Sequence, residues 1–145
     1  RIQLYANKRP WSSTEIVIND KDKFSIFIVG SGETRPCNRP KCKIEPIHFN
    51  KLVIKIGEEN EFKFLKFNRS GFTTVRDLTN VGELMITYED WRSWPPEPGV
   101  YQDNSGYALI DVFLFEKDKK NQFNNFLREL KKINPKDANM SKIYP

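Results

Sequence analysis

The residues with the clearest chemistry are oxygen-bearing side chains on either side of a proline-rich stretch: Asp90 before it, and Asp103 and Asn104 after it. Loop carboxylates, amides and backbone carbonyls are the usual ligands of calcium, which takes six or more oxygens. Asp103 and Asn104 are adjacent in a turn that ends at Gly106, so both side chains can reach one ion. Prolines within residues 95–98 lower the entropy lost when the loop is ordered. The pattern predicts a calcium site, and an ordinary Asp-Asn-Ser-Gly turn is the alternative.

Three aromatic residues, Trp91, Trp94 and Tyr101, lie in the same stretch. Exposed aromatic faces are surfaces on which sugar rings and peptide side chains pack. The alternative is that these rings form a small core of their own within the loop. The first interpretation makes them candidate ligand-binding residues.

The sequence offers little for catalysis. Its one histidine, His48, lies between two apolar residues, and a general base also needs a positioned partner. No serine or cysteine lies in a nucleophile-elbow sequence. Adjacent carboxylates such as Glu58 and Glu59 would point to opposite faces if they lay on a strand. We therefore do not expect an enzyme.

The elements that must position these residues are mostly strands. Apolar runs rich in β-branched and aromatic residues, bounded by turn residues, predict strands. We expect them at residues 4–7, 15–19, 24–30, 52–57, 61–67, 82–88 and 107–115. Apolar residues then recur by threes and fours over 119–133, which predicts an amphipathic helix that Pro135 ends. The fold class is therefore all-β, an antiparallel β-sandwich or jelly roll with one C-terminal helix.

Two segments lack a periodic pattern. Ser31 to Asn50 contains three prolines and reads as a long irregular loop. The residues after the helix, up to Pro145, read as a tail.

Composition limits the class of protein. A chain of 145 residues is one ordinary domain with a sizeable core. The net charge of +5 is spread over nearly every expected strand, which argues against nucleic-acid binding. No apolar run is long enough to span a membrane. Because the sequence begins at Arg1 without an apolar signal region, we expect a processed mature chain or a segment of a larger one.

The two cysteines, Cys37 and Cys42, have four residues between them. A structural zinc ion normally takes four Cys or His ligands, so a zinc site is not expected. A local disulfide would suit an exported protein, and two thiols in a reducing compartment are the alternative.

Four stretches, taken in order, carry a resemblance to a known family. They are Leu-Tyr-Ala-Asn at 4–7, the paired runs at 16–30, the cysteine pair followed by 52–57, and the segments 82–90, 98–101 and 103–106. Together they resemble the PA-I-type galactophilic lectins, which are small bacterial calcium-dependent sugar-binding β-sandwiches. The resemblance covers most of residues 4–115. It implies a lectin-like β-sandwich domain at 1–118, and the amphipathic helix and tail at 119–145 lie beyond the family's pattern.

The resemblance also implies a set of site residues. Two sugar hydroxyls would complete the calcium shell, and Asp90 and Asn104 would also bind them by hydrogen bonds. It further implies a disulfide between the two cysteines and a secreted, cell-surface or periplasmic location. The implied calcium ligands are the side chains of Asp90, Asp103 and Asn104, the carbonyl of Val100, and a carbonyl near Thr34.

The chain departs from the family at the site itself. Residues 91–97 are inserted where the family makes a tighter turn, and Asp103 stands where it usually has asparagine. The family's sugar-contacting histidine and glutamine have no counterpart here. The main hypothesis is a calcium-dependent carbohydrate-binding domain, for which the resemblance implies a galactose-type sugar. One alternative is an adaptor that has lost sugar binding and binds a protein partner, or itself, through the Trp-containing loop or the helix at 119–133. Another is a targeting domain of a larger enzyme.

Overall fold

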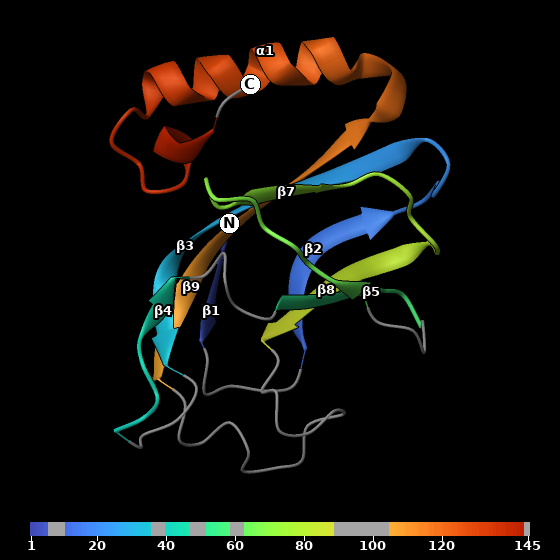
Figure 1. Ribbon diagram of the computed structural model, residues 1–145. Helices are drawn as coiled ribbons and strands as arrows, with labels where there is room; N and C mark the ends of the chain where they lie inside the picture. The colour runs from blue at the N-terminus through green and yellow to red at the C-terminus, as the bar shows by residue number, and fades with distance from the viewer. Residues whose placement is uncertain (6–10, 36–39, 47–51, 59–62, 89–104, 144–145) are drawn as a thin grey trace.

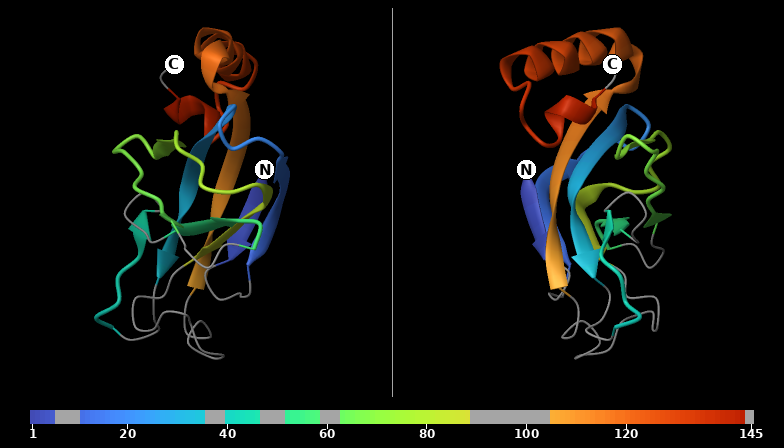
Figure 2. Two further views of the ribbon diagram at one scale, coloured as in Figure 1. Left: turned by 90° about the vertical axis from the view of Figure 1, so that its right-hand side faces the viewer. Right: turned by 60° about the vertical axis from the view of Figure 1, so that its left-hand side comes forward.

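The computed structural model describes residues 1–5, 11–35, 40–46, 52–58, 63–88 and 105–143. These residues form two antiparallel sheets with one long helix, α1, at one end (Figure 1). Figure 2 shows from two further sides that α1 lies beyond the same end of the strands. The expected all-β sandwich with a C-terminal helix is confirmed.

The first sheet, sheet A, is built around two long strands. Strands β3 and β9 pair along their whole length, from Phe24 opposite Glu116 to Arg35 opposite Ser105. The strand order in sheet A is β1 (Ile2–Tyr5), β9 (Ser105–Glu116), β3 (Phe24–Arg35) and β4 (Glu45–Pro46), and β7 (Phe72–Val75) also pairs with β3.

The second sheet, sheet B, is smaller. Its order is β2 (Ser12–Ile18), β8 (Gly82–Tyr88), β5 (Leu52–Ile56) and β6 (Lys63–Phe64). Alternate side chains of both sheets point between them, as the period of two along a strand requires. Buried core residues from β3, β9, β5 and β8 include Ile26, Ile28, Ala108, Ile110, Ile54, Ile56, Leu84 and Ile86.

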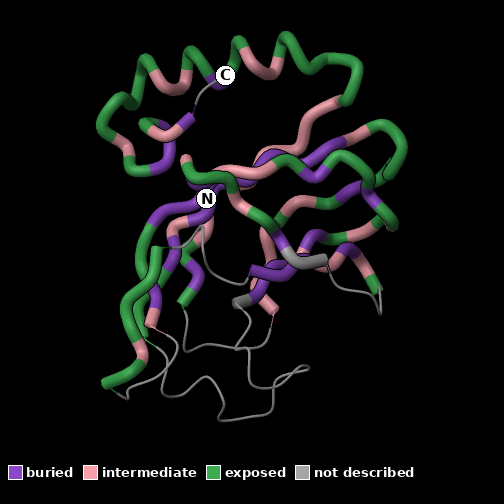
Figure 3. The backbone as a smooth tube through the Cα atoms, in the orientation of Figure 1, coloured by how far each residue is buried: buried purple, intermediate pink, exposed green. Residues whose placement is uncertain are grey.

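The opposite face of sheet A is also apolar. Phe27 and Val29 of β3 belong to a second buried cluster, against which Phe113 and Phe115 of β9 pack. A short 3-10 helix, η2 (Lys117–Lys119), leads into α1 (Lys120–Ile133), whose residue Leu127 is buried in this cluster. Figure 3 shows most of α1 exposed, with less exposed positions along the side that faces the sheet. Strands buried on both faces explain why β3 and β9 read as nearly continuous apolar runs.

One part of the expected irregular loop is a strand. The prediction that the chain is irregular from Ser31 onward is wrong for residues 31–35, because β3 continues to Arg35. Glycines and polar residues there resemble a turn in sequence, but the ladder with β9 supplies backbone partners to the end. Glu33 also pairs with Pro46 in β4. Residues 36–39 and 47–50 lie outside the described residues.

The prediction that the residues after the helix form a tail is also wrong for residues 134–143. They form a turn and a second 3-10 helix, η3 (Met140–Lys142), that pack on sheet A. Asn139 and Ile143 are buried. The Asn139 amide donates hydrogen bonds to the Leu109 carbonyl at 3.0 Å and to Asp111 Oδ2 at 2.9 Å. No helix in the described part of the chain is long and apolar enough to cross a membrane.

A polar cluster on the outer face of sheet A joins both ends of the described chain. The Arg1 guanidinium donates to both oxygens of the buried Asp111 carboxylate, at 2.8 and 2.9 Å. It also donates to the Asp137 carboxylate at 2.8 Å. Asp137 in turn accepts the backbone N–H groups of Asn139 and Met140. These backbone hydrogen bonds, together with Arg1, hold the pKa of Asp137 below its usual range.

We expect Asp137→Ala to lower the free energy of unfolding by about 1–2 kcal/mol at pH 7, because hydrogen bonds to a charged group are lost. A carboxyl whose pKa is lowered by folding stabilises the fold above its unfolded pKa, near 4. That contribution is lost as the pH falls through the lower folded pKa. Urea unfolding at pH 7 and at pH 2.5 measures the difference.

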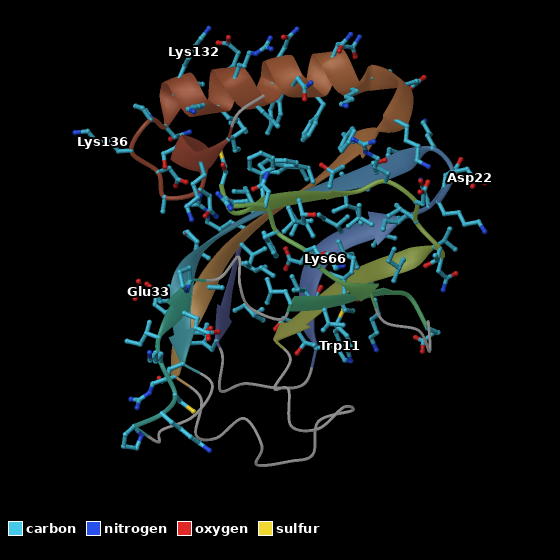
Figure 4. The ribbon with its side chains drawn as sticks, in the orientation of Figure 1. Trp11, Asp22, Glu33, Lys66, Lys132 and Lys136 are labelled. Atoms are coloured by element: carbon cyan, nitrogen blue, oxygen red, sulfur yellow. The ribbon has the colours of Figure 1, made fainter. Side chains whose placement is uncertain are left out.

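Asp22→Ala, in the exposed turn labelled in Figure 4, is the matched control and should change stability little. If Asp137→Ala lowers the free energy of unfolding by the same amount at both pH values, this assignment is contradicted.

Candidate functional site

The predicted calcium loop, residues 89–104, connects the two sheets. Strand β8 ends at Tyr88 in sheet B, where it pairs with Leu52, and β9 begins at Ser105 in sheet A, where it pairs with Arg35. In Figure 1 these strand ends lie at the end of the sandwich away from α1. The fold therefore brings the start and finish of this loop to one end of the molecule.

Most of the predicted site lies outside the described residues, and its assignment stays a prediction. Among the described residues, no group of three or more His, Cys, Asp or Glu side chains is arranged to hold a metal ion. Of the expected ligands only Thr34 is described. The residues outside the described part are Asp90, Trp91, Trp94, Val100, Tyr101, Asp103 and Asn104.

Thr34 lies near the end of β3 rather than in a loop, and is 1% exposed. It is opposite Gly106 of β9 on one side and opposite Glu45 of β4 on the other. Gly106 follows Asn104 by two positions, so Thr34 lies across from the strand that begins directly after the predicted ligands. A carbonyl oxygen has two lone pairs, so one that accepts a ladder hydrogen bond can still coordinate a cation.

Two glycines set how closely β3 and β9 approach at this end. Gly106 has φ 85°, and a Cβ there would collide with the Glu33 carbonyl and lie 3.2 Å from the Thr34 Cα. Gly32 has φ 109°, and a Cβ there would collide with the Tyr107 carbonyl. Both positions therefore require glycine for conformation and for space.

The segment after β3 is fixed by further contacts. Cys42 is disulfide-bonded, and Cys37 is the one other cysteine in the chain. The Arg35 guanidinium donates from Nε to the Cys42 carbonyl at 2.9 Å. At Cys42 the structure therefore has a disulfide and not a free thiol. Arg35, the last residue of β3, is hydrogen-bonded to this disulfide-bonded segment.

The outer face of sheet A carries a second polar surface near this end, which the sequence pattern did not reveal. A groove of about 650 Å³ is lined by Ser31, Glu33 and Tyr107, with Lys142 at its border. The Tyr107 ring lies 5.9 Å from that of Tyr5. Lys142 donates to the Gly30 carbonyl at 3.1 Å, and burial lowers the pKa of its ammonium group. No periodic sequence signal marks this surface, because Ser31 and Glu33 lie in a run of polar and glycine residues.

A scan against protein-family models finds no match to this chain, and a search of curated proteins finds none. Among solved structures, the chain is similar to the N-terminal domain of EclA, described as a PllA-like lectin. The TM-score is 0.59 at 16% sequence identity, over 78% of this chain and 93% of that chain. The chain therefore has the sandwich fold of a lectin domain, as the sequence resemblance implied.

We expect Gly106→Ala to lower the free energy of unfolding by about 1–3 kcal/mol, because the added Cβ collides with the backbone of β3 in a left-handed conformation. Urea unfolding at neutral pH measures the change. Ser105→Ala, at the exposed neighbouring position, is the control and should stay close to the parent. Equal stability of the two variants would show that β9 does not require glycine there.

Proposed function

We propose that this chain is a calcium-dependent carbohydrate-binding domain and not an enzyme. The observation that carries the proposal is the lectin-type sandwich, in which β8 and β9 flank the predicted ligands. β8 finishes and β9 begins at the end of the sandwich where Thr34 lies. A fold alone does not define a function, so the chemistry of the predicted loop must supply the rest of the argument.

The donor set of the loop suits calcium. Asp90 and Asp103 would contribute two negative charges, and Asn104 a neutral amide oxygen. The carbonyls of Val100 and Thr34 would add neutral oxygens. Calcium accepts six to eight oxygens in a flexible arrangement, so these five donors leave room for two neighbouring sugar hydroxyls.

The same residues would then recognise the sugar. Asp90 and Asn104 would accept hydrogen bonds from the hydroxyl groups, and bonds to a charged acceptor are the stronger ones. Trp91, Trp94 and Tyr101 would pack on the apolar face of the ring. The family resemblance favours a galactose-type sugar, and the disulfide at Cys42 favours an oxidising compartment such as the periplasm or the cell exterior.

Calorimetric titration of the chelator-treated protein with calcium tests the metal site. We expect saturable binding, at least tenfold weaker in Asp103→Ala, because one charged ligand is removed. Asp22→Ala removes the same charge from a distant exposed turn and should bind as the parent does. Absence of binding heat, or equal affinity in both variants, would refute the calcium site.

A glycan array with calcium, and with chelator in its place, then tests the sugar. We expect galactose-type glycans to be bound only with calcium. Binding that persists in chelator would contradict calcium dependence, and an empty array for a calcium-loaded protein would contradict carbohydrate binding.

A second candidate function has one observation in its favour. On α1, Phe126 and Ile133 are 49% and 73% exposed, which leaves apolar surface on the helix. An adaptor that binds a protein partner, or a second copy of itself, would use such a surface. An empty glycan array together with self-association that Ile133→Ser abolishes would favour this function.

A further inference from the structure

A cleft lies between α1 and the outer face of sheet A, away from the predicted calcium loop. Its volume is about 560 Å³, within the usual range of small-molecule sites. Thr74 and Arg76, from β7 and the residue after it, line one side, and Asn124 of α1 lines the other. The cleft is therefore framed by an edge strand and the first turns of the helix.

Aromatic rings form much of the apolar lining. Phe123 stacks on Phe115 with ring centres 4.4 Å apart, and Phe27 lies 5.5 Å from Phe72 and 5.8 Å from Phe123. Rings that contact one another in this way hold each other in position, so the surface is formed before any ligand arrives. Such a surface favours the apolar part of a ligand.

The charged groups of the lining are mainly cationic. Arg76, Lys117 and Lys120 line the cleft, and Asp77 is the one acidic residue among its described lining residues. Within the described part of the chain none of these three cations forms an ion pair. The neighbouring lysines differ, because Lys119 and Lys23 both pair with Glu116, at 2.8 and 3.4 Å.

We propose that this cleft binds a small amphipathic anion, with its apolar chain on the aromatic surface and its carboxylate at the cationic side. The class of ligand is a carboxylate with an apolar tail, such as a medium-chain fatty acid. The charges argue against a cationic apolar ligand, because an ammonium group would meet uncompensated positive charge. The site needs neither calcium nor sugar and is independent of the proposed lectin activity.

Calorimetric titration of the full chain with octanoate, and separately with octylammonium, tests the proposal. The two probes have the same chain length and opposite charge. We expect saturable binding of one octanoate per chain and at least tenfold weaker binding of octylammonium. Equal affinity for the two probes, or no saturable binding of octanoate, would overturn the proposal.

Charge reversal locates the site. Arg76→Glu combined with Lys120→Glu should weaken octanoate binding at least tenfold. Lys136→Glu makes the same type of charge change at an exposed position outside the cleft, labelled in Figure 4, and should leave the affinity unchanged. A loss of affinity no larger in the double variant than in Lys136→Glu would contradict binding in this cleft.

A variant that fills the cleft gives a separate test. Thr74→Trp places a large ring at an exposed strand position of the lining, where aromatic residues are well tolerated. Circular dichroism checks its fold, and we expect the affinity of the folded variant for octanoate to be at least tenfold lower. Unchanged affinity would overturn the proposal, and the charge-reversal variant decides it if Thr74→Trp does not fold.

Discussion

The pairing of β3 with β9 is the interaction on which the rest of the structure depends. The register runs unbroken from Phe24 opposite Glu116 to Arg35 opposite Ser105. One face of this pair contributes to the core between the sheets, and the other contributes to the cluster under α1. A slip of one residue would turn every side chain of the slipped strand to the wrong face. The same register places Thr34 opposite Gly106, next to the predicted calcium loop.

Within the apolar outer face of sheet A, one buried charge specifies where the C-terminal segment docks. Asp111 is 5% exposed, and a carboxylate so buried is costly unless it is paired and hydrogen-bonded. Arg1 and Asn139 supply those partners from segments far apart in sequence. Apolar packing of residues such as Ile143 supplies the buried apolar surface that stabilises docking. The carboxylate is satisfied only when the segment lies in this one position. We interpret the buried Asp111 carboxylate as a source of specificity rather than of net stability.

Local pattern was sufficient for several periodic elements, but the prediction of a strand at 61–67 is wrong for residues 65–67, since β6 covers only Lys63–Phe64. The alternating and apolar runs predict β8, and the spacing of Phe123, Leu127 and Leu130 predicts α1 to within a residue of its observed start. The end of β3 could not be predicted, because its glycines resemble a turn until β9 is placed beside them. The packing of residues 134–143 could not be predicted either, because it depends on Asp111, a distant residue. A loop site has no periodicity, so its ligand set was predicted from residue types and family resemblance. Of these ligands the structure describes only Thr34, which lies on a strand rather than in a loop.

The separation of β3 and β9 in the chain has a consequence for biosynthesis. Phe24 pairs with Glu116 and Arg35 with Ser105, so each β3 residue is made well before its partner in β9, and the helix that covers Phe27 is made later still. Folds dominated by such distant pairings fold slowly, because a long loop must close before its contacts form. On the ribosome, β3 is therefore an apolar strand without this partner until β9 has been made, and exposed apolar strands are prone to aggregation. The apolar outer face of β3 is thus covered only after both β9 and α1 have emerged.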